Sequence, residues 1–138
     1  MVHFFNEDVS YVLKDKMKLK NWVKIMIEQH QKSLGEVNFV FCSDEYLHEM
    51  NVEYLQHDTL TDIITFDYCD GNTVSGDLFI SIDRVKDNAS DLKIKLTDEL
   101  HRVMIHGVLH LIGFKDKSQQ DAATMRSQEE KSLILRGF

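Results

Sequence analysis

Two histidines and one aspartate in the C-terminal half of the chain have the types and spacing of a metal site. His106 and His110 are four residues apart, and residues at that spacing lie on one face of a helix, about one turn from each other. Gly113 can end this helix and turn the chain back, which brings the carboxylate of Asp116 toward both imidazoles. Two histidines and a carboxylate, with one position left open, form a catalytic zinc set. We therefore predict a metal site at His106, His110 and Asp116.

The alternative for the histidine pair is a structural role in the core. Val108, Leu109 and Leu111 surround the pair with apolar residues, where unpaired imidazoles are costly unless something binds them. Gly107 stands where the His-Glu-x-x-His helix of zinc proteases carries its general-base Glu, so that mechanism lacks its base. Gly107 also indicates either close approach of a backbone or substrate, or tight helix packing.

The other candidate ligands have simpler interpretations. His101 lies about 140° from His106 around a helical wheel, so we interpret it as a surface residue or as a hydrogen-bonding neighbour of the site. His30 continues an apolar stripe and is interpreted as a half-buried histidine. Cys42 and Cys69 form no Cys-x-x-Cys pair, and we expect each to be a reduced, partly buried thiol.

The elements that must position these residues follow from the spacing of apolar residues. In the first half of the chain we expect a strand at 3–5, a helix at 19–34 ended by Gly35, a strand at 37–42, and a helix begun by Ser43 and Asp44 that reaches Tyr54. Strands at 63–66 and 78–82, joined by a turn at 70–72, follow. The last three elements are helices: one at 85–92, one begun by Thr97 and ended by Gly113, and one opened by Ser118 and Asp121 that reaches Leu135. This order predicts an α+β (mixed α/β) fold, in which helices cover a small mixed β-sheet and a helix of the C-terminal half carries the metal site.

Length and composition set the class of protein. The 138 residues fit one domain, 1–138, and 43% hydrophobic with 28% charged residues is typical of a soluble globular chain. We find neither a signal-peptide pattern at the start nor an apolar run of roughly 20 residues, so we expect a cytoplasmic protein with no membrane contact. The net charge of -7 disfavours non-specific attraction to nucleic acid, so a nucleic-acid role needs a local basic patch or a metal.

The residues around the histidine pair resemble a known family. The stretch 106–114 follows without a gap the signature His-Gly-x-Leu-His-Leu-x-Gly plus an aromatic residue, which is that of the YbeY family of bacterial metal-dependent endoribonucleases. Asp116 stands where the family has its third histidine ligand, and Lys115 stands where the family usually has Asp. A carboxylate at this position lowers the net charge of the site and favours harder metal ions.

Two further stretches support the resemblance. Residues 51–62 are similar to the family pattern Asn-x-x-Tyr-Arg-x-x-Asp-x-x-Thr-Asp, with Leu55 in place of the arginine. Residues 76–81 are similar to the family strand Gly-Asp-aliphatic-x-Ile-Ser. In the first of these stretches we expect His57 and Asp58 to contact substrate, and His57 could partly replace the missing guanidinium.

The resemblance implies a zinc-dependent endoribonuclease that cleaves single-stranded RNA. One Zn²⁺ per chain would be held by His106, His110 and Asp116. The implied role is rRNA maturation, at the 3′ end of 16S rRNA, together with ribosome quality control. The implied partners are single-stranded RNA or rRNA and the ribosomal small subunit or one of its proteins. No side chain is singled out as the general base.

Two other functions remain open from the residues. The first is a zinc-containing ribosome-assembly factor with weak or no nuclease activity, because Leu55 removes a bidentate donor to phosphate and the net charge of -7 suits docking onto a basic ribosomal protein. The second is a different metallohydrolase that acts on a small phosphoester or amide.

Overall fold

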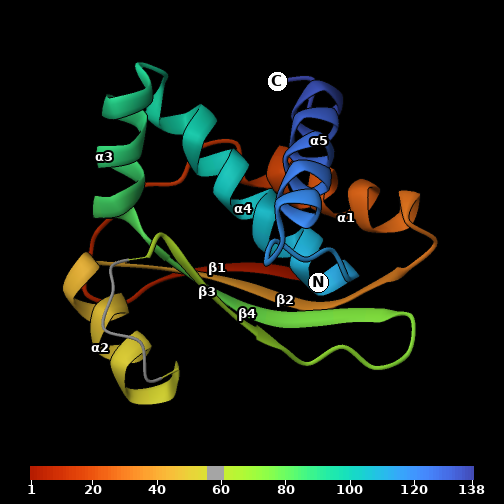
Figure 1. Cartoon of the computed structure of the whole chain (residues 1–138), viewed down its shortest axis with the longest axis horizontal. Coiled ribbons are helices and arrows are strands. Elements are labelled where there is room, and N and C mark those ends of the chain that lie inside the picture. The colour runs from red at the N-terminus through yellow and green to blue at the C-terminus, as the bar shows by residue number, and fades with distance from the viewer. Residues whose placement is uncertain (56–60) are drawn as a thin grey trace.

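A mixed β-sheet forms the centre of the protein, with helices on both of its faces (Figure 1). The computed structural model describes residues 1–55 and 61–138. Its strands are β1 (Val2–Asn6), β2 (Ser33–Cys42), β3 (Ile63–Asp67) and β4 (Thr73–Ser81). Its helices are α1 (Lys16–Gln29), α2 (Asp44–Leu55), α3 (Ile82–Leu92), α4 (Leu96–Ile112) and α5 (Gln119–Leu135). The predicted α+β class is confirmed.

The strand order in the sheet is β1-β2-β4-β3. β1 pairs with β2 and β2 pairs with β4 in parallel, whereas β3 and β4 form an antiparallel hairpin. The predicted hairpin and the predicted mixed sheet are therefore confirmed. The parallel pairs are joined by α1 and by the segment that contains α2 and β3, as parallel strands require long crossover connections.

Alternating side chains give the sheet two apolar faces. Phe39, Leu78 and Ile80 belong to the main core with residues of α1 and α4. Phe79 lies between Leu78 and Ile80 in β4 and packs on the other face, in a smaller cluster that includes Leu47 of α2. Figure 1 shows the same division, with α1, α4 and α5 on one side of the sheet and α2 on the other.

Gly107 allows α4 to pack closely on the sheet. A Cβ atom at this position would lie 2.7 Å from Cδ1 of Ile63 and 2.8 Å from Cδ2 of Leu78. These distances are shorter than any ordinary carbon–carbon contact. Of the two interpretations of Gly107, the structure therefore supports tight helix packing. This packing places the helix that carries His106 and His110 directly over β3 and β4.

The helix ends predicted at Ser43, Gly113 and Ser118 are confirmed. The Ser118 hydroxyl accepts a hydrogen bond from the backbone N–H of Asp121 at 3.0 Å. The Ser43 hydroxyl likewise accepts one from Tyr46 at 3.1 Å. Gly113 follows α4 with φ 128°, a backbone conformation that L side chains rarely adopt. The chain can therefore turn back after α4, as Asp116 requires.

Several predicted boundaries are wrong, and the strands expected to begin at 37 and 78 begin earlier, at Ser33 and Thr73. The helix expected to run to Leu34 and Gly35 ends at Gln29, because Gln31 adopts a left-handed conformation (φ 59°) and Leu34 pairs with Val74 in the sheet. Ile82 begins α3 and is not part of a strand. Thr97 lies inside α4, whose N-cap is Lys95. At the end of α1, a backbone conformation and pairing in the sheet override a short apolar pattern.

The two cysteines are free thiols, as predicted. Cys42 is buried and Cys69 is partly buried. Burial, together with nearby carboxylates such as Asp8, raises the pKa of the Cys42 thiol to about 12. Among the helices of residues 1–55 and 61–138, we find none with the length and apolar character needed to cross a membrane.

Candidate metal centre

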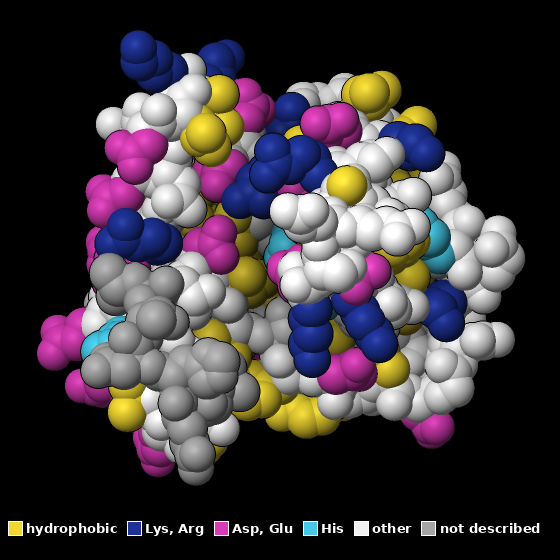
Figure 2. Space-filling model, in the orientation of Figure 1, with side chains coloured by type: hydrophobic (Ala, Val, Ile, Leu, Met, Phe, Trp, Pro, Cys, Tyr) yellow, Lys and Arg dark blue, Asp and Glu magenta, His cyan; other side chains and the backbone are white. Residues whose placement is uncertain are grey.

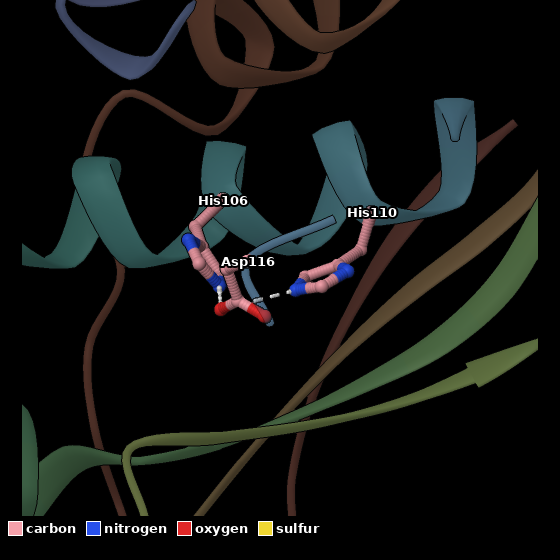
Figure 3. A group of neighbouring side chains, drawn as sticks. All are labelled: His106, His110 and Asp116. Carbon is pink, nitrogen blue, oxygen red and sulfur yellow. Dashed lines mark ion pairs between the residues drawn. The ribbon is translucent and has the colours of Figure 1, made fainter. Parts of the chain in front are cut away.

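His106, His110 and Asp116 come together at the end of α4. Both imidazoles project from the helix, and the chain after Gly113 returns the carboxylate between them (Figure 3). Nε2 of His106 and Nε2 of His110 each lie 3.5 Å from Oδ2 of Asp116. One ligand atom from each residue lies within 4.8 Å of the others. The structure therefore brings together all three residues that the sequence singled out.

The donor set and its spacing fit a divalent metal. Ligand atoms about 2.1 Å from a tetrahedral zinc ion are about 3.4 Å apart, which is close to the 3.5 Å between each Nε2 and Oδ2 of Asp116. The same separation is too long for a good N–H···O hydrogen bond. The separations between the carboxylate and the two imidazoles therefore fit coordination of a metal ion better than direct hydrogen bonds between the side chains.

A network of buried and partly buried charged side chains lies behind His106. Nδ1 of His106 is 2.6 Å from Oε2 of Glu129, which is on α5. Arg102 Nη1 donates to Oε1 of Glu129 at 3.1 Å. Arg102 also donates through Nε and Nη2 to Glu99, at 2.8 Å each, and Nη2 lies 3.6 Å from Oδ2 of Asp62. One arginine thus joins three carboxylates beside the three candidate ligands.

Burial and charge act in opposite directions on these groups. Burial raises the pKa of Asp62, and the opposing attraction of Arg102 is the smaller effect. For Glu129, burial also raises the pKa, but hydrogen bonds and attraction from His106 and Arg102 outweigh it and the pKa is lowered. The hydrogen bonds to Glu99 are the main reason that the pKa of Arg102 is raised. Glu129 and Arg102 are therefore held as an ion pair.

Sequence reasoning did not identify this network, although part of the signal was present. Glu99, Arg102 and His106 follow at steps of three and four and therefore share one face of α4. Glu99 lies in the first turn of α4 and is nevertheless 0% exposed. Glu129 is 23 positions beyond His106, and no motif in the sequence connects the two residues.

His101 and His30 do not belong to the group of candidate ligands and have other partners. His101 is 6% exposed, so its interpretation as a surface residue is wrong. Its Nδ1 accepts a hydrogen bond from Arg136 at 2.7 Å, and its ring packs on Trp22. His30 is partly buried, as predicted, and its Nδ1 lies 2.8 Å from the carbonyl oxygen of Met26.

The predicted substrate contacts lie outside the described residues. His57 and Asp58 belong to the segment 56–60, for which the structure gives no description. Leu55 is the last residue of α2, and the position of its side chain is likewise outside the description.

Two lysines are next to the candidate ligand Asp116 in the chain. Figure 2 shows one face of the molecule, on which lysine and arginine side chains lie among acidic and apolar ones. Lys115 and Lys117 flank Asp116 in the chain, and both are exposed. Although the protein is acidic overall, these two lysines offer local cations to an anionic ligand.

Comparisons with known proteins agree on one family. The family model described as Endoribonuclease YbeY matches residues 4–135. The chain is 49% identical over 131 residues to the Endoribonuclease YbeY of Flavobacterium johnsoniae and 50% identical over 131 residues to that of Flavobacterium psychrophilum. Each alignment covers 95% of this chain and 94% of the relative. A Thermotoga maritima protein solved in solution has the same fold, with a TM-score of 0.69 at 23% identity, over 99% of this chain and 89% of that one.

Proposed function

The chain belongs to the YbeY endoribonuclease family, and from this premise we propose that His106, His110 and Asp116 bind the metal ion with which it cleaves RNA. The protein is an RNA-cleaving hydrolase with a role in rRNA maturation. The catalytic domain is the whole of residues 1–138, since the family model spans nearly all of it. The metal is Zn²⁺, one ion per chain.

The observation that carries the proposal is the convergence of three donors on one point. The ligand atoms of His106, His110 and Asp116 lie within 4.8 Å of one another. Zinc binds nitrogen and oxygen donors of this kind in catalytic sites that leave a position open. A site with one carboxylate and two neutral imidazoles carries a formal charge of -1 before the ion binds. A divalent ion makes the net charge of the site positive, and a positive site attracts a phosphate.

The chemistry of the centre divides between the metal and the protein. A bound divalent ion supplies Lewis-acid assistance to hydrolysis of the phosphodiester bond. The protein orients the three ligands, with two of them on rigid α4. Lys115 and Lys117, exposed on either side of Asp116, attract the phosphate backbone of the substrate.

The finer parts of the function are proposals of the same kind. The substrate is single-stranded RNA, contacted by His57 and Asp58, and the physiological target is the 3′ end of 16S rRNA, in ribosome maturation and quality control. The protein acts in the cytoplasm together with the ribosomal small subunit or one of its proteins. No observation on the described residues favours an assembly factor without nuclease activity or a hydrolase of small molecules.

The direct test is cleavage of a fluorescent single-stranded RNA by the zinc-loaded protein. We expect wild type to cut it, and both His110→Ala and Asp116→Ala to lose at least about 100-fold in rate while circular dichroism shows them folded. Glu130→Gln, an exposed change on α5, serves as the charge control and should keep its activity. Wild-type rates in both alanine variants would contradict the proposal.

A further inference from the structure

We propose that Glu129 is the positioning residue of the metal centre, which keeps the proton of His106 on Nδ1 and leaves Nε2 free to bind the ion. This inference rests on the metal site proposed above. It adds a residue from α5, a helix that carries none of the proposed ligands.

The two nitrogens of His106 face different partners. Nδ1 lies 2.6 Å from Oε2 of Glu129, whereas Nε2 lies 3.5 Å from Oδ2 of Asp116. An ionised carboxylate can only accept a hydrogen bond, so Nδ1 donates to Glu129. Because a neutral imidazole has a single N–H, Nε2 then presents its lone pair to the cluster. A carboxylate behind a histidine ligand also makes the ligating nitrogen more basic.

Glu129 is itself fixed in place. Its residue is 6% exposed, and its second oxygen accepts from Arg102 at 3.1 Å. Arg102 is held in turn by Glu99 through its 2.8 Å hydrogen bonds from Nε and Nη2. Rotation of the Glu129 carboxylate would break its contacts with both Arg102 and His106. The position of Glu129 is therefore determined by α4, the same helix that carries the histidines.

Glu129→Gln is a sharp test because the amide cannot serve both neighbours. Arg102 only donates hydrogen bonds, so the amide must direct its oxygen toward the guanidinium. Its NH₂ group then faces Nδ1 of His106, which must become an acceptor. The proton moves to Nε2, the nitrogen that faces Asp116. The variant thus has nearly the same shape as wild type but the wrong histidine tautomer for metal binding.

The first measurement is Zn²⁺ affinity by competition with a chromophoric chelator. We expect Glu129→Gln to bind zinc about 10–100-fold more weakly than wild type, the usual effect of removing such a partner. Glu130→Gln removes the same charge one residue away on the exposed side of α5 and should bind within about twofold of wild type. If wild type binds zinc and the affinity of Glu129→Gln is within about twofold of it, the role of Glu129 is overturned but the proposed metal site is not. A wild type that binds no zinc would overturn both this inference and the proposed metal site.

The second measurement reads the tautomer without metal or activity. Nitrogen-15 NMR of the imidazoles at about pH 9, well above the ordinary histidine pKa of about 6.5, distinguishes Nδ1–H from Nε2–H. The His106 signals are assigned by their absence in His106→Gln. We expect Nδ1–H in wild type and in Glu130→Gln, and Nε2–H in Glu129→Gln. Nε2–H in wild type would overturn the inference, and this result does not depend on whether Glu129→Gln folds.

Discussion

Arg102→Met is expected to destabilise the protein strongly, because it removes the cation that Glu99, Glu129 and Asp62 share beside His106. The change keeps the length and apolar contacts of the arginine stem but deletes the guanidinium. Glu99, which is 0% exposed, then loses both 2.8 Å hydrogen bonds from Arg102. Glu129 loses its 3.1 Å hydrogen bond from the same residue.

The magnitude follows from the burial of these groups. Breaking a buried ion pair by removing one partner costs about 3–5 kcal/mol, since it leaves a buried charge without compensation. The side chain of Arg102 is 31% exposed, so water can reach part of the vacated space and we take the lower end, about 3 kcal/mol. With a urea dependence of about 1.5–2 kcal/mol per molar, the midpoint of unfolding should fall by about 1.5–2 M.

The assay is urea unfolding followed by circular dichroism, without metal. Arg126→Met, at an exposed arginine of α5, is the matched control and should stay within about 0.5 kcal/mol of wild type. The double variant Glu99→Met/Arg102→Met removes the buried charge together with its partner and should recover about half of the loss or more. An Arg102→Met variant as stable as Arg126→Met would refute this account of the network.

Three further changes test other parts of the structure. Gly107→Val should lower the free energy of unfolding by about 1–3 kcal/mol, measured by urea unfolding, because the space next to Leu78 is already filled; unchanged stability would contradict the tight packing of α4. Burial, together with the neighbouring Arg136 cation, lowers the pKa of His101 to about 4. As the pH falls from about 6.5 to 4, His101 therefore takes up a proton in the unfolded chain but not in the folded one. This should lower the free energy of unfolding of wild type by at most about 3 kcal/mol. His101→Gln should lose that part of the pH dependence. Asp116→His restores a neutral third ligand, so in chelator competition it should favour Zn²⁺ over Mn²⁺ more than wild type does, and an unchanged ratio would contradict a ligand role for Asp116.

The sequence predicted the parts of the site that lie close together in the chain. His106, His110, Gly113 and Asp116 fall within one helix and its turn, so helical periodicity and a glycine stop were enough to bring the three donors together. The hairpin of β3 and β4 was predictable for the same reason, since its strands are joined by a short turn.

The parts that depend on tertiary contacts were not predictable. Glu129 reaches His106 only because α5 packs along α4, and no local pattern records that packing. Leu34 fits the apolar spacing of α1, but its pairing with Val74 places it in β2. His101 is buried although its position in α4 does not predict it. Trp22 and Arg136, which come from distant parts of the chain, contact its ring.

The measurement that tests the central claim most directly is the metal content of the purified protein. Wild type and Asp116→Ala would be equilibrated with Zn²⁺, dialysed without chelator, checked for folding by circular dichroism and analysed by mass spectrometry. The account predicts about one zinc ion per wild-type chain and little or none in the folded variant, since Asp116 lies 3.5 Å from both Nε2 atoms. A wild type without metal, or an Asp116→Ala variant that keeps a full equivalent of zinc, would contradict it.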